Sequence, residues 1–363
     1  MAFTDNINDY KVWVFAPYLE TTDPNLQYYY DYTQSIEEYT KVFAGLNCEW
    51  QWLNITIENL GQQIEQVKNH ANKTNIVLNL CDGDEINGVP GISVIDALTS
   101  THITYTGAGA HFYDITTSKI TMKQAFARQY IAMPKWVELT GDNDTTVFDT
   151  IGDTVIIKPA ISAGSMGLNI KNVVTNADEL NDLLLDIKKG YRGWKLDEAG
   201  LIAEQFIIGR EFTTFLTGSS EFSETIQFYS PVERVFHASL PEKEQFLSFD
   251  RLWEIYEEEN PMPDDGYLYE YAGVDSTELV AALKDLSIRA FNAVGGTGYA
   301  RLDIRMDKDG KLYVLEINAQ CGISDDENYT SIGAILRFSN KTFSNLVVEI
   351  LDDALLRHKQ PAQ

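Results

Sequence analysis

Short apolar segments alternate with segments of helical periodicity in the first third of the chain. The apolar segments predict strands at 12–15, 49–55, 75–80 and 103–107. The segments between the first three strands predict helices at 31–45 and 59–71. Strands separated by helices at this spacing predict a parallel, Rossmann-like sheet of about four strands. No G-x-G-x-x-G sequence follows the first strand, which argues against a dinucleotide site.

The pattern changes after residue 115. A helix is predicted over 116–131 and ends at Met133-Pro134, and a final amphipathic helix is predicted over 331–357. Residues 219–275 are rich in Glu, Phe and Tyr and show no clear periodicity. Between these segments the pattern predicts strands at 154–158, 168–173 and 201–208, helices at 177–188 and 276–294, and a hairpin near 300–319. The chain thus reads as an α/β protein of three domains, 1–115, 116–205 and 206–363.

The hairpin brings two carboxylates together. Asp309-Gly310 predicts a two-residue type I′ turn, so residues whose numbers sum to 619 lie opposite each other. On one face Asp303 then meets Glu316 and Arg301 meets Asn318, while Leu302, Ile304, Leu315 and Ile317 take the other face. Like charges at roughly 4.5–5.5 Å between Cβ atoms destabilise a sheet, and Mg²⁺ is the natural compensating ion for such oxygen ligands. A solvated hairpin without a ligand is the alternative, and a three-residue loop would break this register.

Composition limits the classes of partner. The 363 residues are 44% apolar and carry a formal net charge of −26, which argues against a nucleic-acid partner because nucleic-acid binding depends on Lys and Arg. A site for a phosphate-bearing ligand must gather its few cations locally. The N-terminal sequence lacks the features of a signal peptide, which predicts a cytoplasmic protein. Cys48, Cys81 and Cys321 are far apart and are predicted to be buried thiols.

A lysine precedes a loop of small residues in the segment 155–168. Lys158 ends an apolar strand, and Gly164 and Gly167 would let backbone N–H groups approach phosphate oxygens. A structural turn is the alternative. In the strand that follows, Glu204 interrupts an apolar run and needs a partner if it is buried. An adenine amino group could be that partner, with backbone contacts at Phe206 and Ile207; a surface-facing carboxylate is the alternative.

Taken in order, these segments resemble the ATP-grasp superfamily, and most closely the D-alanine–D-alanine ligase family. The resemblance spans roughly residues 75–323. It is carried by K-P-x-x-x-x-G-S-x-G at Lys158–Gly167, by A-E-Q-F-I-I-G-R-E-F at Ala203–Phe212, and by G-Y-A-R-L-D-I and L-E-I-N between Gly298 and Asn318. It implies an ATP-grasp fold, with an N-terminal Rossmann-like domain and two α+β subdomains that clamp ATP.

The resemblance also implies roles for individual residues. The residues that would bind ATP are Lys119, Lys158, Gly164, Ser165, Met166, Glu204, Phe206, Ile207 and Glu211. Among these, both lysines would reach phosphates, and Glu211 would hold the ribose hydroxyls. The Mg²⁺ ligands, usually for two ions that Mn²⁺ can replace, would be Asp303, Glu316 and Asn318. The catalytic residues would be Arg301, Ser165 and Gly322: Arg301 would stabilise the acyl phosphate, and the Gly322 N–H would help form an oxyanion site.

The amino-acid pockets depart from the family pattern. The family's G-G-x-S-x-E is replaced by Phe15–Glu20, its H-G-x-x-G-E-D-G loop by residues 79–88, and its S-P-G-M-T by residues 320–324. An acidic cluster, Asp82–Glu85 with Glu327, predicts a substrate that carries an amine and predicts poor activity with D-alanine alone. The sequence does not name the two substrates.

We therefore interpret the chain as an ATP-dependent carboxylate–amine ligase. One alternative is a D-alanine–D-alanine ligase with variant loops. The other is a nucleotide-binding regulator without catalysis, against which the retained metal ligands and Arg301 argue. The substrates are expected to be small molecules, and exposed tyrosines near the N-terminal sheet are compatible with a homodimer.

Overall fold

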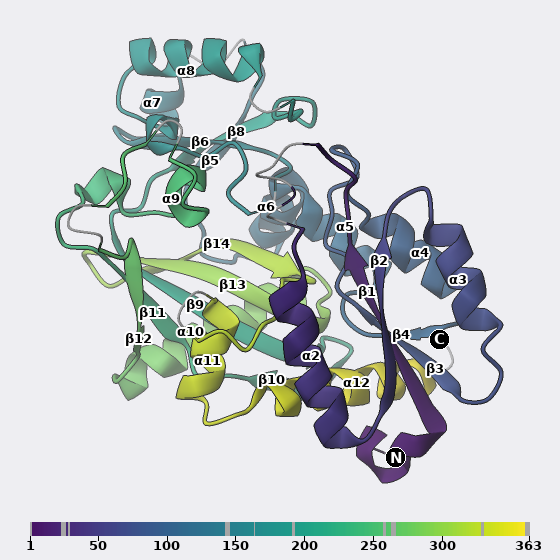
Figure 1. Cartoon of the computed structure of the whole chain (residues 1–363). Coiled ribbons are helices and arrows are strands. Elements are labelled where there is room, and N and C mark those ends of the chain that lie inside the picture. Colours follow the sequence, from purple (N-terminus) through teal and green to yellow (C-terminus); the bar gives the residue numbers. More distant parts are fainter. Residues whose placement is uncertain are drawn as a thin grey trace.

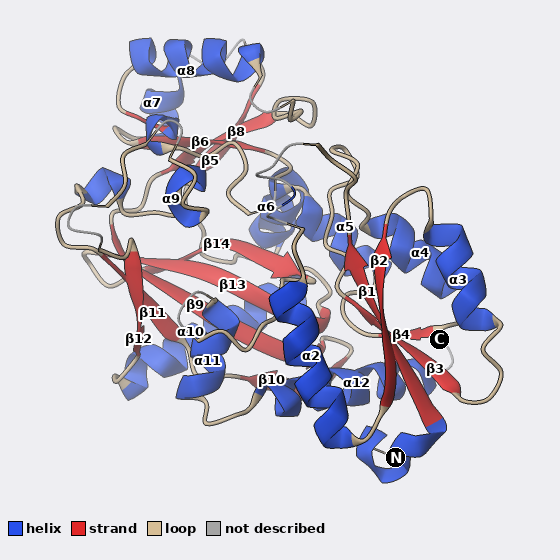
Figure 2. Cartoon of the chain, viewed as in Figure 1, coloured by secondary structure: helices blue, strands red, loops and turns tan. Residues whose placement is uncertain are grey.

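Three β-sheets organise the part of the chain that the computed structural model describes (Figures 1 and 2). The structure describes residues 2–22, 27, 30–141, 146–162, 164–190, 193–256, 259–262, 266–327 and 330–359. No helix in these ranges is long and apolar enough to cross a membrane. Cys48, Cys81 and Cys321 are buried free thiols, as predicted.

The first sheet is parallel and has the strand order β2-β1-β3-β4. Its two faces follow the alternation of the strands. Trp13 and Phe15 point toward α3 and α4, whereas Val12 and Val14 point toward α2 and α12. The elements of this region are η1 (Phe3–Asp9), β1 (Tyr10–Pro17), α2 (Thr33–Leu46), β2 (Glu49–Ile55), α3 (Leu60–Lys68), β3 (Thr74–Asn79), α4 (Ile92–Ser100), β4 (Thr104–Tyr105) and α5 (Ala110–Thr117). The predicted four-stranded parallel sheet is confirmed.

The second sheet is antiparallel, with the order β5-β8-β6-β7 and a hydrophobic core of its own. Its elements are β5 (Trp136–Leu139), α7 (Val147–Ile151), β6 (Val155–Pro159), η3 (Ile170–Asn172), β7 (Val173–Val174), α8 (Ala177–Lys189) and β8 (Leu201–Gln205). The predicted strand at 168–173 is wrong for most of its length. The Asn169 side chain accepts a hydrogen bond from the Lys171 N–H and favours a turn there.

The third sheet has the order β12-β11-β9-β13-β14, with β10 paired to β9. Its elements are β9 (Gly209–Ser219), β10 (Phe222–Phe228), β11 (Val232–Phe236), η4 (Glu242–Glu244), α9 (Phe249–Leu252), β12 (Tyr269–Gly273), α10 (Thr277–Ala293), β13 (Thr297–Asp307), β14 (Leu312–Ala319), α11 (Ser331–Phe338) and α12 (Phe343–Lys359). The segment without periodicity, 219–275, therefore supplies the edge of this sheet and the loop that carries α9.

Two helices predicted as continuous are interrupted. The predicted helix 116–131 is split between α5 and α6 (Lys119–Arg128), because Ser118 is extended and caps α6 by accepting from the Ile120 N–H. The predicted helix 331–357 is split between α11 and α12. Thr342 and Asn345 exchange side-chain and backbone hydrogen bonds that begin the second helix. The first break matters because it places Lys119 at a helix start.

The first and third sheets share their cores. One cluster joins Trp13 and Phe15 to Leu302 and Ile304, and α12 packs against both β4 and β9 (Figure 1). We propose the predicted boundaries near 115 and 205 as domain boundaries, since each sheet falls within one range. The core of the second sheet also contains Phe249 of α9, so the segment after the third sheet's β11 packs against the second sheet.

Candidate functional site

Asp303 and Glu316 lie opposite each other in β13 and β14, as the sequence predicted. The predicted turn is nevertheless wrong. Asp307 pairs with Lys311 across a three-residue loop, and Gly310 takes a φ of +82°. A β-bulge between Asp303 and Ile304 on one strand and Glu316 and Val314 on the other shifts the pairing back by one residue. The loop and the bulge cancel, so the two carboxylates still meet.

The bulge also changes the apolar face of the hairpin. Ile304 pairs with Val314, and Val314 lies in the core with Leu302 and Ile317. Leu315 was predicted to share that face but is the extra residue of the bulge and is only partly buried. Its carbonyl accepts a hydrogen bond of 3.4 Å from Lys123. The bulge therefore removes Leu315 from the predicted apolar face and leaves the pairing of Asp303 with Glu316 as predicted.

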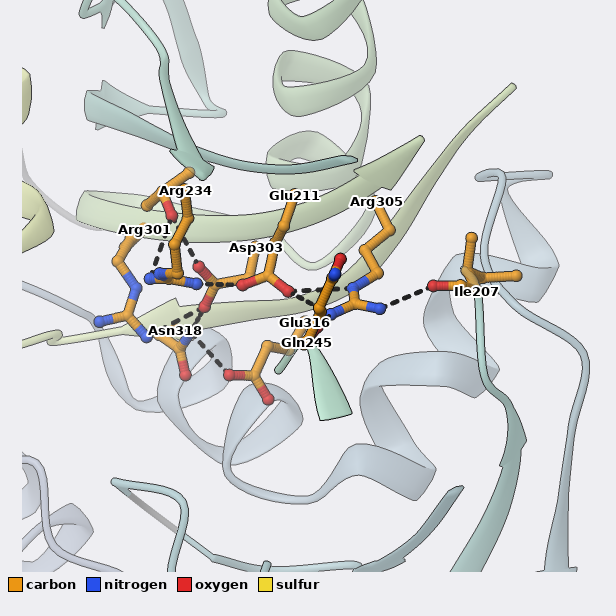
Figure 3. A network of polar contacts seen from close by, with 10 residues as sticks. Ile207, Glu211, Arg234, Gln245, Arg301, Asp303, Arg305, Glu316 and Asn318 are labelled. Atoms are coloured by element: carbon orange, nitrogen blue, oxygen red, sulfur yellow. Dashed lines mark hydrogen bonds and ion pairs between the residues drawn. The ribbon is translucent and has the colours of Figure 1, made fainter. Parts of the chain in front are cut away.

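Neighbouring side chains orient the two carboxylates (Figure 3). Asp303 accepts from Arg301 at 3.1 Å and from Thr213 at 3.1 Å. The Asn318 side chain lies 3.4 Å from Asp303 and 3.2 Å from Glu316. The pKa of Arg301 is raised, because attraction to Asp303 outweighs burial. The three predicted metal ligands and Arg301 therefore form one cluster.

The donor set of this cluster suits Mg²⁺. Two facing carboxylates and an amide oxygen, exposed by rotation of the Asn318 amide, are hard oxygen ligands. No group of three or more His, Cys, Asp and Glu side chains able to hold a metal exists within the described ranges. The cluster has two carboxylates, so substrate oxygens would have to complete the coordination of an ion. This is the arrangement expected where Mg²⁺ binds with a nucleotide.

Three buried lysines gather beside this cluster. Lys119 at the start of α6 donates to the Ser162 hydroxyl at 3.1 Å, which ties it to the glycine-containing loop. Lys123, one turn later, is fully buried and pairs with Glu204. Lys158 in β6 lies 2.7 Å from the same carboxylate. In a chain of net charge −26, three lysines around one glutamate form a local positive site suited to phosphate.

Glu204 is the centre of this lysine group. Burial alone would raise its pKa, but attraction first to Lys123 and then to Lys158 outweighs burial and lowers the pKa to about 2. Burial also lowers the pKa of Lys119 and of Lys123. The prediction that a buried Glu204 needs a partner is correct, but its partners here are two lysines. Its predicted contact with adenine stays a prediction.

Glu211 lies between two arginines. Arg234 in β11 and Arg305 in β13 occupy the positions directly opposite Glu211 on either side of β9. Arg305 donates to Glu211 at 2.8 and 2.9 Å, and Arg234 forms a second ion pair with it. Burial would raise the pKa of Glu211, but the attraction of Arg234 and Arg305 lowers it. The predicted ribose ligand is therefore a buried, ionised carboxylate with two cations beside it (Figure 3).

The predicted adenine hinge, Phe206 and Ile207, adjoins Arg305. The Arg305 guanidinium lies 4.9 Å from the centre of the Phe206 ring and donates to the Ile207 carbonyl at 2.7 Å. The Phe206 N–H donates to the Thr154 carbonyl. The Phe206 N–H and the Ile207 carbonyl thus already have hydrogen-bond partners within the protein. The Ile207 N–H is therefore the backbone donor whose contact with adenine is to be tested.

The loop after β6 has a left-handed backbone at three of its residues. Gly164, Ser165 and Gly167 have φ of +54°, +62° and +75°, the left-handed region that glycine adopts readily. A Cβ on Gly167 would collide with Leu196. The Trp253 side chain donates to the Gly164 carbonyl at 2.9 Å, which joins the loop to the segment after α9.

A cavity of about 760 Å³ lies beside this loop and is lined by residues from all three of the predicted domain ranges. Met166 and Gly322, predicted for ATP binding and catalysis, line it. Asp82 and Asp84 of the predicted acidic cluster also line it, whereas the Glu85 carboxylate accepts from the Gly91 and Ser93 N–H groups at the start of α4. Glu327 is not among the lining residues and faces Arg337 at 4.0 Å. Two of the four acidic groups of the predicted cluster therefore face the cavity.

Several site residues escaped the sequence analysis. Lys123 could have been found, because it follows Lys119 by four residues on one helix face. Arg234 and Arg305 gave no local signal. The cavity wall residues Tyr39 and Trp52 also gave none, because they come from α2 and β2, far in sequence from the motifs.

Comparison with known proteins gives a family match. The family model of the D-ala D-ala ligase C-terminus matches residues 125–352. The D-alanine–D-alanine ligase of Dechloromonas aromatica is 26% identical over 257 residues, which are 70% of this chain and 74% of that protein. The ligase of Acinetobacter baumannii (strain AYE) is 27% identical over 256 residues, 70% of this chain and 72% of that protein.

Solved structures match over nearly the whole chain. The D-alanine–D-alanine ligase of Bacillus anthracis, complexed with ATP, has a TM-score of 0.66 at 19% identity and covers 96% of this chain and 98% of its own. The D-alanyl-alanine synthetase A of Vibrio cholerae has a TM-score of 0.68 at 13% identity, with 96% and 99% covered. The predicted α/β ATP-grasp fold is confirmed.

Proposed function

This chain belongs to the D-alanine–D-alanine ligase family, and from that premise we propose that it joins an amino acid, or a similar carboxylate, to an amine. The family forms amide bonds with ATP, so the chain is an ATP-dependent carbon–nitrogen ligase acting on small molecules. The γ-phosphoryl group of ATP would pass to the carboxylate, giving an acyl phosphate and ADP. The amine then attacks the acyl carbon, and phosphate leaves.

The arrangement of lysines and carboxylates is the observation that carries this proposal. Three lysines gather around Glu204 and the glycine-containing loop: Lys119, Lys123 and Lys158. The facing carboxylates of Asp303 and Glu316 form the second part of the site. Phosphoryl transfer consists mostly of positioning and charge stabilisation. A protein that only bound a nucleotide would gain nothing from two facing carboxylates beside Arg301, because without a cation they repel.

Each part of the site would have a separate task. The lysines hold the phosphate oxygens, and the loop at Gly164–Gly167 covers them. Arg301 and the Gly322 N–H stabilise the negative charge that develops on the reacting carboxylate. Asp303, Glu316 and Asn318 would hold Mg²⁺, which when bound neutralises phosphate charge. No enzyme nucleophile is needed, because the acyl phosphate is itself the activated intermediate.

A phosphate-release screen tests the proposal. Purified protein is mixed with ATP, Mg²⁺ and a matrix of amino acids, small dipeptides and hydroxy acids, and products are identified by mass. We expect phosphate release that requires both an acid and an amine. ATP binding without turnover for any pair would instead indicate the nucleotide-binding regulator, and D-alanine as the best substrate of both sites would indicate the variant D-alanine–D-alanine ligase.

Homodimerisation and a cytoplasmic location stay predictions. Light scattering of the purified chain measures the first directly.

Replacing Lys158 by Met should weaken ATP use. The variant removes one cation beside the glycine-containing loop at nearly constant side-chain length, and a charge-assisted hydrogen bond contributes about 1.5–3 kcal/mol. The KM for ATP should therefore rise about 10-fold or more. Lys188→Met, an exposed lysine on α8, is the matched control and should behave as wild type. Unchanged kinetics for Lys158→Met would mean that this lysine serves only to neutralise Glu204.

A further inference from the structure

Two groups of aromatic side chains, each called a wall below, line the 760 Å³ cavity. One wall comes from the N-terminal region and the other from residues 194–253: they are Tyr30, Tyr39 and Trp52, and Trp194, Phe249 and Trp253. Ring contacts hold each wall together, with centroids 5.9 Å apart for Tyr39 and Trp52 and 4.9 Å apart for Trp194 and Phe249. Cavities of roughly 300–1,000 Å³ with apolar walls bind drug-sized ligands. A substrate whose side chain is one methyl group cannot cover both walls.

Asp82 is the acidic group of the cavity that has capacity for a ligand. Asp84 uses both oxygens on Asn87, through its N–H at 3.0 Å and its amide nitrogen at 2.8 Å. Within the described ranges, Asp82 accepts only from its own backbone N–H, and Arg301 is the cation that acts on it. Burial is the main reason that the pKa of Asp82 is raised to about 6. A ligand ammonium would relieve that burial penalty.

Among the described residues that line the cavity, no lysine or arginine side chain is without an acidic partner. Lys195 is the lysine of the lining, and it lies 3.3 Å from Glu198. Glu254 adds a further carboxylate. The charge of the cavity is therefore negative, which favours a ligand with an amine over a second free carboxylate.

We propose that the acyl donor is an α-amino acid with an aromatic side chain, which occupies this cavity while its ammonium pairs with Asp82. The proposal rests on the ligase function above and names its substrate. The donor carboxylate must lie near Arg301 and the Gly322 N–H, where phosphoryl transfer would occur, and Gly322 and Asp82 both line this cavity. An ammonium and a carboxylate on one carbon fit these two groups, and the side chain then extends between the aromatic walls.

Steady-state rates test the substrate class first. Both enantiomers of phenylalanine, tryptophan and alanine are compared as acyl donors with one fixed amine, and products are checked by mass. We expect kcat/KM for an aromatic amino acid to exceed that for alanine by about 10-fold or more, since each added apolar group in a pocket contributes a factor of about 10–200. Equal or better use of alanine would overturn the inference while leaving the ligase function intact.

A filling variant tests the position of the side chain. Ser35 on α2 lines the cavity, whereas Glu37 on the same helix is exposed and lies outside it. Ser35→Trp should raise the KM for the aromatic donor about 10-fold and leave that for alanine nearly unchanged. Glu37→Trp, which adds the same side chain to the same helix, should behave as wild type. Equal losses for both donors with Ser35→Trp would show that the side chain binds elsewhere.

Asp82→Asn tests the ammonium contact. Calorimetry with a non-hydrolysable ATP analogue measures binding of phenylalanine and of 3-phenylpropionate, which lacks the amine. We expect the variant to lose affinity for phenylalanine about 10-fold and to bind 3-phenylpropionate as well as wild type does. Equal losses for both ligands would reject Asp82 as the ammonium partner. This readout needs no turnover, so failure of the ligase function and failure of this inference give different results.

Discussion

Replacing Asp303 or Glu316 by the isosteric amide is expected to lower ligation by at least about 100-fold. Asp303→Asn and Glu316→Gln each remove a negative charge that would hold Mg²⁺ and orient it toward the phosphates. The fold should persist, because each change also removes one member of a like-charged pair in β13 and β14. Phosphate release and product mass measure the loss, and thermal melting without nucleotide measures the fold.

A matched control exists on the same hairpin. Asp309 is exposed at the hairpin tip, and Asp309→Asn should retain wild-type ligation and melting. Thermal melting with Mg²⁺ and ATP gives a second readout, because a ligand that binds the folded state raises its stability. The wild type should gain stability from Mg²⁺–ATP, and the Glu316→Gln variant should gain less. Near wild-type ligation at low Mg²⁺ in either variant would refute the metal assignment.

Glu204→Ala is expected to destabilise the protein more than any surface change. Glu204 is 1% exposed, and its removal leaves Lys123 and Lys158 buried without their carboxylate. Breaking a buried ion pair by removing one partner typically costs about 3–5 kcal/mol in the free energy of unfolding. Urea unfolding measures this loss. Glu138→Ala on the neighbouring strand β5, where the side chain is exposed, is the control and should change stability little.

The stability that Glu204 contributes is expected to decrease as the pH falls. The pKa of Glu204 is lowered from 4.5 to about 2 in the folded protein, so its contribution is fully present above pH 4.5 and is lost as the pH falls through about 2. The difference between wild type and Glu204→Ala should therefore be constant at neutral pH and shrink in acid. A double variant, Glu204→Leu with Lys123→Met, should lose less than the sum of the single variants. Additive losses would show that Lys123 and Glu204 are not coupled.

The hairpin of β13 and β14 was predicted from the sequence only in part. The facing of Asp303 and Glu316 was predicted correctly, although the predicted two-residue turn was wrong. The three-residue loop at Lys308–Gly310 shifted the register, and the bulge at Leu315 shifted it back. A turn dipeptide does not fix its loop length, and a bulge has no strong sequence signal. The predicted pairing was therefore correct because the two shifts cancel, although the turn from which it was derived was wrong.

Sequence alone determined the local features of this protein. The alternation of strands and helices, the glycine-containing loop after Lys158 and the facing carboxylates all depend on residues near one another in the chain, where periodicity and spacing act directly. These features were sufficient for the fold class and for the ligase family.

The tertiary structure decided which groups that are far apart in the sequence meet in the folded protein. Lys123 and Glu204 are buried together from different elements, and Arg234 and Arg305 flank Glu211 because β11 and β13 happen to pair with β9. Strand order is set by packing of whole faces, which no short window of sequence contains. The aromatic cavity likewise brings together Trp52 and Trp253, which are about 200 residues apart in the sequence. The substrate class proposed for this cavity therefore depends on long-range packing, which a short window of sequence does not contain.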